Sequence, residues 1–295
     1  MNKIAVIGAG TMGNGIAHVF AQKGYEVHLV DVSEKALERG LATISQNLDR
    51  MLAKGRISTT DKDDTLQNIT THISLKDGVK GVSLAIEAAS EEPALKMSLF
   101  QELDKHCGPD TILATNTSSI SITQIAAATS RPSQVIGMHF MNPVPIMPLV
   151  EVIRGYSTSD EVTKQVMDLS HKLGKTPTEV NDYPGFVANR ILMPMINEAM
   201  ETLHHGVAGV LEIDTVMKLG MAHPMGPLQL ADFIGLDVCL SILNVMHNGF
   251  KNPKYAPSPL LVNMVMAGKL GVKSGEGFYD YTASKKAEKV ADRFL

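Results

Sequence analysis

The sequence predicts an α/β fold: a doubly wound, mostly parallel sheet with an inserted helical excursion, followed by an all-helical C-terminal domain. Three observations predict this fold. Short β-branched runs alternate with helical patterns in the N-terminal part, which is typical of strands joined by crossover helices. The stretch after the second predicted strand is too long for an ordinary crossover. Beyond Asn181 the strand patterns almost disappear, so we expect domains over residues 1–181 and 182–295.

The first strand, turn and helix are predicted at the start of the chain. The run Ile4–Ile7 leads into Gly8-x-Gly10-x-x-Gly13, and a helical pattern follows up to Ala21. In such a turn the glycines permit unusual backbone angles, close approach of a pyrophosphate, and close packing of helix on strand. The alternative is that they serve a tight turn only. We expect a Rossmann-type dinucleotide site, with phosphates at the helix N-terminus, that includes Gly8, Ala9, Gly10, Thr11, Met12 and Gly13.

The second predicted strand, residues 27–30, ends at Asp31. A carboxylate at this position suits the two ribose hydroxyls of NAD and repels the 2′-phosphate of NADP. The sequence therefore predicts NAD as the cofactor.

The helical excursion begins at Ser33, a residue type that caps helices, and continues as an amphipathic pattern to Leu52. We expect a polar turn over residues 59–64 and a returning strand over residues 69–73. The remaining N-terminal elements are strands over 84–87, 111–114, 135–140, 149–153 and 176–180, and helices over 90–106, with acids in the first turn and Pro93 inside it, 122–128 and 160–173. Ligands of open α/β sheets bind at the carboxyl ends of the strands, so Asp31, Ser118 and His139 are expected to line one crevice.

The C-terminal domain is expected to be helical over residues 186–204, 210–219 and 228–246, and its charged tail after Tyr281 to be a frayed helix. Methionines recur along the helical faces. We interpret them as core and subunit interface together, with a dedicated acyl groove as the alternative.

Composition excludes several classes of protein. Apolar residues make up 44% and charged residues 20% of the chain, and no apolar stretch reaches the roughly 18 residues of a membrane helix. The first strand begins at Lys3, so we expect no leader peptide, no membrane association and a soluble, cytoplasmic protein. Cys107 and Cys239 show no metal-ligand spacing, so no metal is expected. A formal charge of −4 without basic runs argues against nucleic acid as a partner.

His139 is the candidate general acid–base, because it ends a strand on the expected cofactor side. A proline-rich turn follows and would fold the next strand back, so that Glu151 could meet the imidazole and fix its tautomer. The alternative is a structural histidine. Ser118 could hydrogen-bond a substrate oxygen or cap a helix, and Asn189, near the start of the helical domain, could point toward substrate or hold a loop.

A set of short motifs, spread in order over essentially the whole chain, resembles the 3-hydroxyacyl-CoA dehydrogenase family, in particular its short-chain branch in bacteria. The motifs are GAGTMGNGIA, IEAASEE, ATNTSS, HFMNPVPIMPLVEVI, DYPGFVANR, AHPMGP and KSGEGFYDY.

The resemblance implies NAD-dependent interconversion of (S)-3-hydroxybutyryl-CoA and acetoacetyl-CoA by a homodimer. It implies that His139 is the catalytic base with Glu151 as its partner, and that Ser118 and Asn189 contact substrate. Further NAD contacts are implied at Glu91, Lys96, Ser118, Asn142 and Lys273, and coenzyme A contacts at Asn47 and Lys54. Asn47 stands where some relatives have serine.

Two other functions remain open at this stage. One is a dehydrogenase of the same superfamily that acts on a hydroxy acid without coenzyme A. The other is a nucleotide-binding scaffold without turnover, although such a scaffold has no need of His139, Glu151, Ser118 and Asn189 together.

Overall fold

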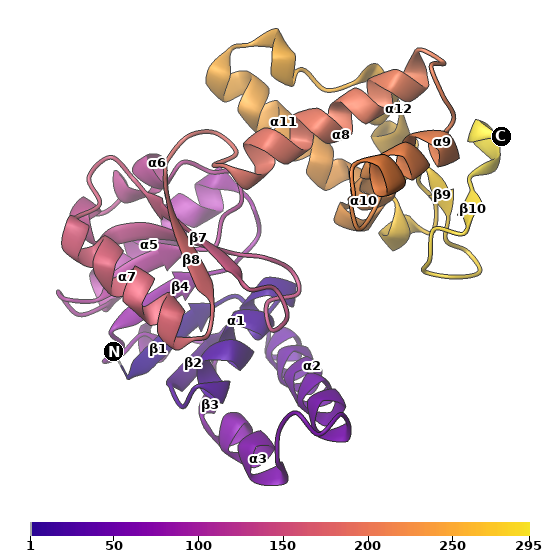
Figure 1. Ribbon diagram of the computed structural model, residues 1–295. Helices are drawn as coiled ribbons and strands as arrows, with labels where there is room; N and C mark the ends of the chain where they lie inside the picture. Colours follow the sequence, from indigo (N-terminus) through magenta and orange to yellow (C-terminus); the bar gives the residue numbers. More distant parts are fainter. Residues whose placement is uncertain (1) are drawn as a thin grey trace. The chain divides into compact units, whose positions relative to one another are not determined.

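The computed structural model describes residues 2–295, and the chain divides into two compact units, Met1–Tyr183 and Pro184–Leu295 (Figure 1). The division falls after Tyr183, where composition places it after Asn181. The first unit contains the sheet and the second is mainly helical, so the predicted fold class is confirmed.

An eight-stranded sheet forms the centre of the first unit, in the order β3-β2-β1-β4-β5-β6-β7-β8. Strands β1 to β6 are parallel, β7 is antiparallel to β6, and β8 is parallel to β7. Every residue of β4, β5 and β6 is buried, the pattern of strands covered on both faces. The strands are β1 (Lys3–Ile7), β2 (Glu26–Val30), β3 (Ile69–His72), β4 (Leu84–Glu87), β5 (Ile112–Thr115), β6 (Val135–Phe140), β7 (Leu149–Arg154) and β8 (Thr176–Asn181).

The strand order reverses between β1 and β4, because the chain first builds outward to β3 and then returns to the other side of β1. Ligands of open α/β sheets bind in the crevice at this reversal. The helices of the unit are α1 (Thr11–Gln22), α2 (Glu34–Ala53), α3 (Thr59–Gln67), α4 (Leu75–Gly78), α5 (Pro93–His106), α6 (Ile122–Ala126) and α7 (Asp160–Lys172), with a 3-10 turn η1 (Pro132–Gln134).

The helical excursion after β2 consists of two helices, α2 and α3, which contact each other and α1 (Figure 1). The expectation of a polar turn over residues 59–64 is wrong, because this stretch begins α3. Ser58 caps the helix by accepting from the Asp61 amide, while the Asp61 carboxylate accepts from the Ser58 amide. This reciprocal cap satisfies amide groups at the start of a helix, so a polar stretch with a weak apolar pattern is still helical.

The second unit is built around its own apolar core. Its helices are α8 (Ala188–His204), α9 (Val210–Thr215), a π-helical segment η2 (Val216–Gly220), α10 (Pro227–Ile234), α11 (Leu236–Phe250) and α12 (Pro259–Met266), with 3-10 turns η3 (Pro253–Tyr255), η4 (Val272–Ser274) and η5 (Asp292–Phe294). Two short strands, β9 (Tyr279–Asp280) and β10 (Lys289–Val290), form an antiparallel pair, so the unit is not entirely helical.

Two helical expectations in this unit need correction. The single helix expected over residues 228–246 is two helices, α10 and α11, bent by 96° where Gly235 adopts a φ of 103°. A positive φ of this size ends an α-helix, and glycine adopts it without a steric penalty. The tail after Tyr281 is not a frayed helix, because β10 pairs with β9 and Ala291 is buried with its amide donating to the Phe278 carbonyl.

No single helix within residues 2–295 combines the length and apolar character needed to cross a membrane. Only α10 and α11 taken together meet that test of length and composition, and the sharp bend separates them.

Two buried carboxylates, Asp214 and Asp232, tie the tail of the chain to the helices of the second unit. Asp232 accepts from the Phe278 and Tyr279 amides at 3.0 and 2.9 Å and from the Tyr281 hydroxyl at 3.2 Å. Asp214 accepts from the Tyr279 hydroxyl at 2.8 Å. Burial raises the pKa of Asp232 to about 7 in spite of these donors, and the nearby charge of Asp214 acts in the same direction.

Between the pKa of Asp232 in the unfolded chain and its higher pKa in the folded protein, only the folded state keeps the proton. The free energy of unfolding is therefore expected to fall as pH rises through this range. An unfolded aspartate has a pKa of about 3.9, so this loss extends from about pH 4 to about pH 7 and then levels off. Asp232→Asn carries no such proton. We expect the wild-type advantage in unfolding free energy over Asp232→Asn, measured with urea, to be larger at pH 5 than at pH 8; an advantage that is equal or larger at pH 8 contradicts this prediction.

Candidate active site

The glycine turn between β1 and α1 brings backbone close to backbone. Gly8 has a φ of 106°, and a side-chain carbon there would lie 2.6 Å from the Ala88 carbonyl oxygen. A side-chain carbon on Gly13 would lie 1.7 Å from the Gly8 carbonyl oxygen. Around Gly10, by contrast, the space within 4 Å of such a carbon is open. The turn is thus closed where helix and strand pack and open where a pyrophosphate would approach the N-terminus of α1.

Asp31 lies directly after β2 and is joined to this turn. Its Oδ2 accepts from the Ala9 amide at 2.8 Å, and its Oδ1 accepts from the Ser33 amide at 2.9 Å. Thr11 and Met12 form the first turn of α1. The carboxylate therefore orients the glycine turn, in addition to the ribose contact expected from the sequence.

A cavity of about 360 Å³ lies at the reversal of strand order, and its walls suit an adenosine group. Gly8, Gly10 and Asp31 supply its polar side, and most of the remaining lining is apolar. The full set of lining residues is Ile7, Gly8, Gly10, Val30, Asp31, Val32, Ala36, Ile73, Leu75, Ala88, Ala89, Ser90, Leu95 and Leu99. The open approach at Gly10 and this cavity together fit a dinucleotide cofactor.

Neutralising Asp31 is expected to weaken discrimination between NADH and NADPH. Asp31→Asn keeps an oxygen that can accept from Ala9 and removes the charge that repels a 2′-phosphate. Two like unit charges 4 Å apart in water repel each other by about 1 kcal/mol. Without this repulsion of NADPH, the ratio of kcat/KM for NADH over that for NADPH should fall roughly five- to tenfold. Glu34→Gln, at an exposed acid in the next helix, is the control and should leave the ratio unchanged. An unchanged ratio in Asp31→Asn would refute the role of this charge.

Glu91, after β4, holds the loop that follows β5. Its Oε1 accepts from the Thr117 hydroxyl at 2.5 Å and from the Ser118 amide and hydroxyl at 2.8 and 3.2 Å. Burial raises the pKa of Glu91, but Lys96 and the donors on Thr117 and Ser118 outweigh it and hold the pKa below its ordinary value. The carboxylate is therefore charged at neutral pH and fixes Ser118 at the edge of the sheet.

Beneath this loop lies a buried ion pair that the sequence analysis did not predict. Lys96 Nζ contacts Glu87 Oε1 at 2.6 Å, Glu91 Oε2 at 3.3 Å and the Ala89 carbonyl at 3.4 Å. The Glu87 side chain is fully buried, and its Oε2 accepts from the Thr115 hydroxyl at 2.7 Å. Lys96 thus has three acceptors around its ammonium group, which connects the ends of β4 and β5 to α5.

His139 and Glu151 face each other across the antiparallel strands β6 and β7. His139 Nδ1 lies 2.8 Å from Glu151 Oε2, and both residues are buried. The carboxylate accepts, so Nδ1 carries the proton and the lone pair of the ring lies on Nε2. This pairing is the one that the proline-rich turn suggests, and it prepares the imidazole to accept a proton at Nε2.

The carboxyl ends of β5 and β6 are held side by side. Asn116 Oδ1 accepts from the Phe140 amide at 2.9 Å, one residue beyond His139. Ser118 lies two residues beyond Asn116, in the loop fixed by Glu91. Asn142, an expected NAD contact, lies exposed in the turn after β6, joined to Pro143 by a cis peptide bond. Ser118, His139 and Asn142 thus belong to loops at the same edge of the sheet.

A second cavity, of about 190 Å³, brings together the two expected coenzyme A contacts, Asn47 and Lys54. Arg50 and Arg56 line it as well, although the sequence analysis did not single them out. The complete lining is His18, Asn47, Arg50, Met51, Lys54, Arg56, Pro143, Pro145 and Ile146. The spacing of 47, 50, 51 and 54 on one helix face was the signal in the sequence that could have identified Arg50. Three cations in one cavity suit a phosphorylated ligand.

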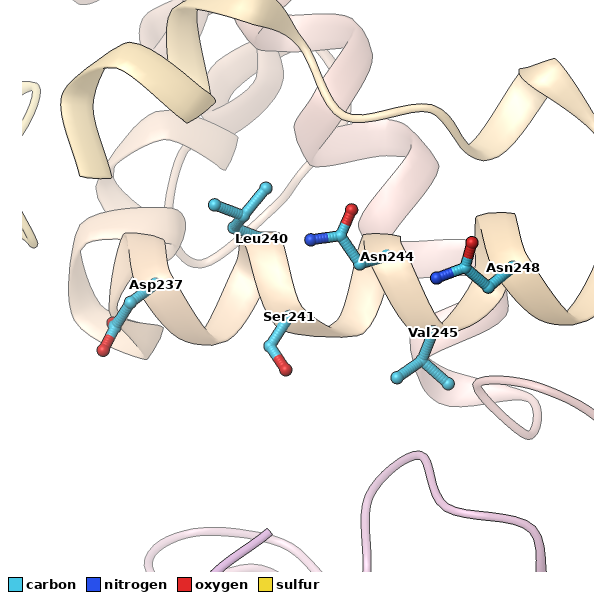
Figure 2. A pocket seen from close by; sticks show the side chains of 6 residues that line it. All are labelled: Asp237, Leu240, Ser241, Asn244, Val245 and Asn248. Carbon is cyan, nitrogen blue, oxygen red and sulfur yellow. The ribbon is translucent and has the colours of Figure 1, made fainter. Parts of the chain in front are cut away.

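The other two expected site residues belong to the second unit. Asn189 is buried in the first turn of α8, and Lys273 forms an ion pair with Asp237 at the start of α11. An open hollow of about 530 Å³ also lies in this unit, but its lining comes from α11 alone (Figure 2). Figure 2 shows its six side chains in two rows along the helix: Asp237, Leu240, Ser241, Asn244, Val245 and Asn248. It is a helix face rather than an enclosed site.

Within residues 2–295, His, Cys, Asp and Glu side chains form no group of three that could hold a metal ion. Cys107 and Cys239 are free and buried.

Three features define the class of protein to which this site belongs. They are the glycine turn at the reversal of strand order, the acid after β2 and the paired histidine at the same edge of the sheet. Together they define a dinucleotide-dependent dehydrogenase.

Comparison with known proteins agrees with this class. Residues 3–183 match the 3-hydroxyacyl-CoA dehydrogenase NAD binding domain, and residues 185–281 match the C-terminal domain of that family. A probable 3-hydroxybutyryl-CoA dehydrogenase of Bacillus subtilis is 53% identical over 281 residues, which cover 95% of this chain and 98% of the relative. The 3-hydroxybutyryl-CoA dehydrogenase of Bradyrhizobium diazoefficiens is 51% identical, with 97% of each chain covered.

Among solved structures, (S)-3-hydroxybutyryl-CoA dehydrogenase of Ralstonia eutropha superposes with a TM-score of 0.92 at 49% identity, covering 95% of this chain and 99% of that one. The chain belongs to the 3-hydroxyacyl-CoA dehydrogenase family. It is an NAD-dependent oxidoreductase, and the resemblance found in its sequence is confirmed.

Proposed function

We propose that this enzyme interconverts (S)-3-hydroxybutyryl-CoA and acetoacetyl-CoA with NAD(H), and that His139 is its general acid–base. The observation that carries the proposal is the 2.8 Å contact between His139 and Glu151 at the ligand-binding edge of the sheet. The names of the relatives in Bacillus subtilis and Bradyrhizobium diazoefficiens support the substrate.

In the oxidative direction, Nε2 of His139 takes the proton of the substrate hydroxyl group. Glu151 stabilises the imidazolium that forms, because its carboxylate already holds the Nδ1 proton. The Ser118 hydroxyl donates to Glu91 Oε1 at 3.2 Å in this structure, and on substrate binding it would turn from Glu91 to donate to the same substrate oxygen, while its amide stays bound to Glu91. A nicotinamide bound at this edge would supply the redox chemistry, as the acceptor of the hydride from C3. In reduction, the imidazolium returns its proton to the oxygen at C3.

The cofactor is proposed to bind over the glycine turn, with Asp31 at the ribose. Glu91 and Asn142 are proposed contacts of its nicotinamide half. Lys96 is fully engaged with Glu87, Glu91 and the Ala89 carbonyl, so its proposed part is to hold this loop in place. In the second unit, Lys273 is a proposed cofactor contact and Asn189 a proposed substrate contact. Residues 1–181 are accordingly proposed as the NAD-binding domain. Residues 182–295 are proposed as the domain for substrate binding and dimerisation.

The coenzyme A part of the substrate is proposed to lie along α2. Asn47 and Lys54 would contact it, and Arg50 and Arg56 add positive charge to the same cavity. These cations are matched to the phosphates of coenzyme A, which a free hydroxy acid lacks.

A comparison of two substrates tests the proposal. The initial rate of NADH oxidation is measured with acetoacetyl-CoA and, separately, with free acetoacetate at the same concentration. We expect rapid oxidation with the thioester and little with the free acid. Preference for the free acid would replace the proposal by a dehydrogenase that does not use coenzyme A. Binding of NADH without turnover of any thioester would favour a non-catalytic role.

We also propose that the enzyme is a homodimer assembled through its second unit. Large apolar side chains are exposed on α9, the π-helical segment and the residue after it, and α10, among them Leu211, Val216, Leu219, Met221 and Phe233. Methionines fill the core of the same unit, as Met193, Met200, Met246 and Met264 do. Two-fold dimers are the commonest way of covering such a face. Sedimentation equilibrium should give twice the chain mass of 31.8 kDa.

Since NAD and coenzyme A are cytoplasmic metabolites, we propose that the enzyme works in the cytoplasm.

A further inference from the structure

His18, on α1, is a buried histidine that the mechanism does not use. Its side chain is fully buried, and neither Nδ1 nor Nε2 has a hydrogen-bond partner among the described residues. A buried polar group without a partner destabilises the folded state, so it is rarely kept without a reason. Leucine or phenylalanine would fill the same space without that penalty.

The imidazole lines the cavity that contains Asn47 and Lys54. The apolar part of the cavity wall comes from Met51, Ile146 and two prolines, and the positive charge comes from Arg50, Lys54 and Arg56. A ligand that fits this lining has an uncharged chain with polar groups at one end and phosphates at the other. The pantetheine and phosphate parts of coenzyme A have this order.

Burial, with the nearby charge of Lys175, keeps the His18 ring neutral. Burial lowers the pKa of His18 to about 4, and the positive charge of Lys175 acts in the same direction. Lys175 is itself held by the Val144 and Met147 carbonyls at 2.5 and 2.8 Å, which belong to the turn that contributes Pro143, Pro145 and Ile146. Lys175 does not line the cavity, whose charged lining residues are Arg50, Lys54 and Arg56. A neutral ring is matched to an amide rather than to a phosphate.

We propose that His18 is a binding residue for the substrate carrier, and that its imidazole hydrogen-bonds an amide of the pantetheine arm of coenzyme A. This inference rests on the proposed function, because it takes the ligand of the cavity to be coenzyme A. It assigns the arm to His18 and the phosphates to Arg50 and Arg56.

Direct binding measurements test the assignment without any turnover. Coenzyme A and adenosine 3′,5′-bisphosphate, which lacks the pantetheine arm, are titrated into the full-length protein in a calorimeter. In His18→Leu we expect the Kd for coenzyme A to rise about tenfold and the Kd for the bisphosphate to stay within twofold. His18→Gln, which keeps a donor and an acceptor, should restore coenzyme A binding. Arg50→Ala should weaken both ligands.

His28→Leu is the matched control for removal of a buried imidazole. His28 lies on β2, and its Nδ1 is bound to the Gly78 carbonyl at 2.7 Å, outside the cavity. Its replacement should leave the Kd for coenzyme A unchanged. An unchanged Kd in His18→Leu, or an equal loss for both ligands, overturns the assignment of His18 to the pantetheine arm.

Kinetics separate the failure of this inference from failure of the proposed function. With acetoacetyl-CoA, His18→Leu should raise KM about tenfold and leave kcat within twofold, because the contact lies away from the reacting carbon. If the wild-type enzyme turns over acetoacetyl-CoA but KM is unchanged in His18→Leu, only the role of His18 is refuted. If the wild-type enzyme does not turn over the thioester, the proposed function itself fails.

Discussion

Replacing His139 by glutamine is expected to lower kcat for acetoacetyl-CoA reduction at least about 100-fold, the lower end of general acid–base contributions. Glutamine has a size similar to histidine but does not donate and accept a proton near neutral pH. The Kd for NADH should stay within a few-fold, because the glycine turn and Asp31 are untouched. Stopped-flow and steady-state rates, with NADH binding followed by fluorescence, measure both quantities.

Two further variants show whether the His139–Glu151 contact is the cause. Glu151→Gln keeps a hydrogen-bond acceptor but removes the charge that stabilises the imidazolium, so kcat should fall by a smaller factor. His171→Gln, at an exposed position of α7, should retain wild-type kcat. A kcat within tenfold of wild type in His139→Gln would rule out His139 as the acid–base.

Among the substitutions proposed here, Lys96→Met is expected to lower the free energy of unfolding most. The Lys96 side chain is 1% exposed and the Glu87 side chain is fully buried, so the substitution leaves a buried carboxylate without its cation. Breaking a buried pair in this way costs about 3–5 kcal/mol. Urea unfolding should show a lower midpoint, and because Glu91 also loses its contact with Lys96, KM for NADH should rise in the protein that remains folded.

Lys105→Met is the matched control, because Lys105 pairs with Glu102 on the exposed surface of the same helix and should change stability little. The double variant Lys96→Met with Glu87→Gln should recover part of the stability, since it no longer buries an uncompensated charge. If Lys96→Met were as stable as Lys105→Met, the claim that the Lys96–Glu87 pair stabilises the folded protein beneath the site would be wrong.

The parts of the fold that local spacing determines could be predicted from the sequence. Gly8, Gly10 and Gly13 follow a β-branched run and open a helix, so strand, turn and helix follow from one another. The His139–Glu151 contact could also be predicted, because the proline-rich connection over residues 141–148 folds β7 back along β6 and places residues of the two strands opposite one another.

Other features depend on caps or on contacts between distant residues. The start of α3 depends on the reciprocal cap between Ser58 and Asp61, which outweighs a weak apolar pattern. The break between α10 and α11 depends on one residue, Gly235, inside a continuous apolar run. For His18 the sequence shows only the residue type, and for Lys96 the resemblance implies an NAD contact rather than the buried ion pair with Glu87. Both roles follow from burial in the folded chain.

The transfer of deuterium tests the central claim most directly. The enzyme is mixed with acetoacetyl-CoA and NADH that carries deuterium at both C4 positions, and the thioester product is isolated for mass spectrometry and NMR. We expect 3-hydroxybutyryl-CoA with one deuterium at C3, because hydride passes from the nicotinamide to that carbon while the proton on oxygen comes from His139. A product without deuterium at C3, or no 3-hydroxybutyryl-CoA while NADH remains bound, would contradict the proposed reaction.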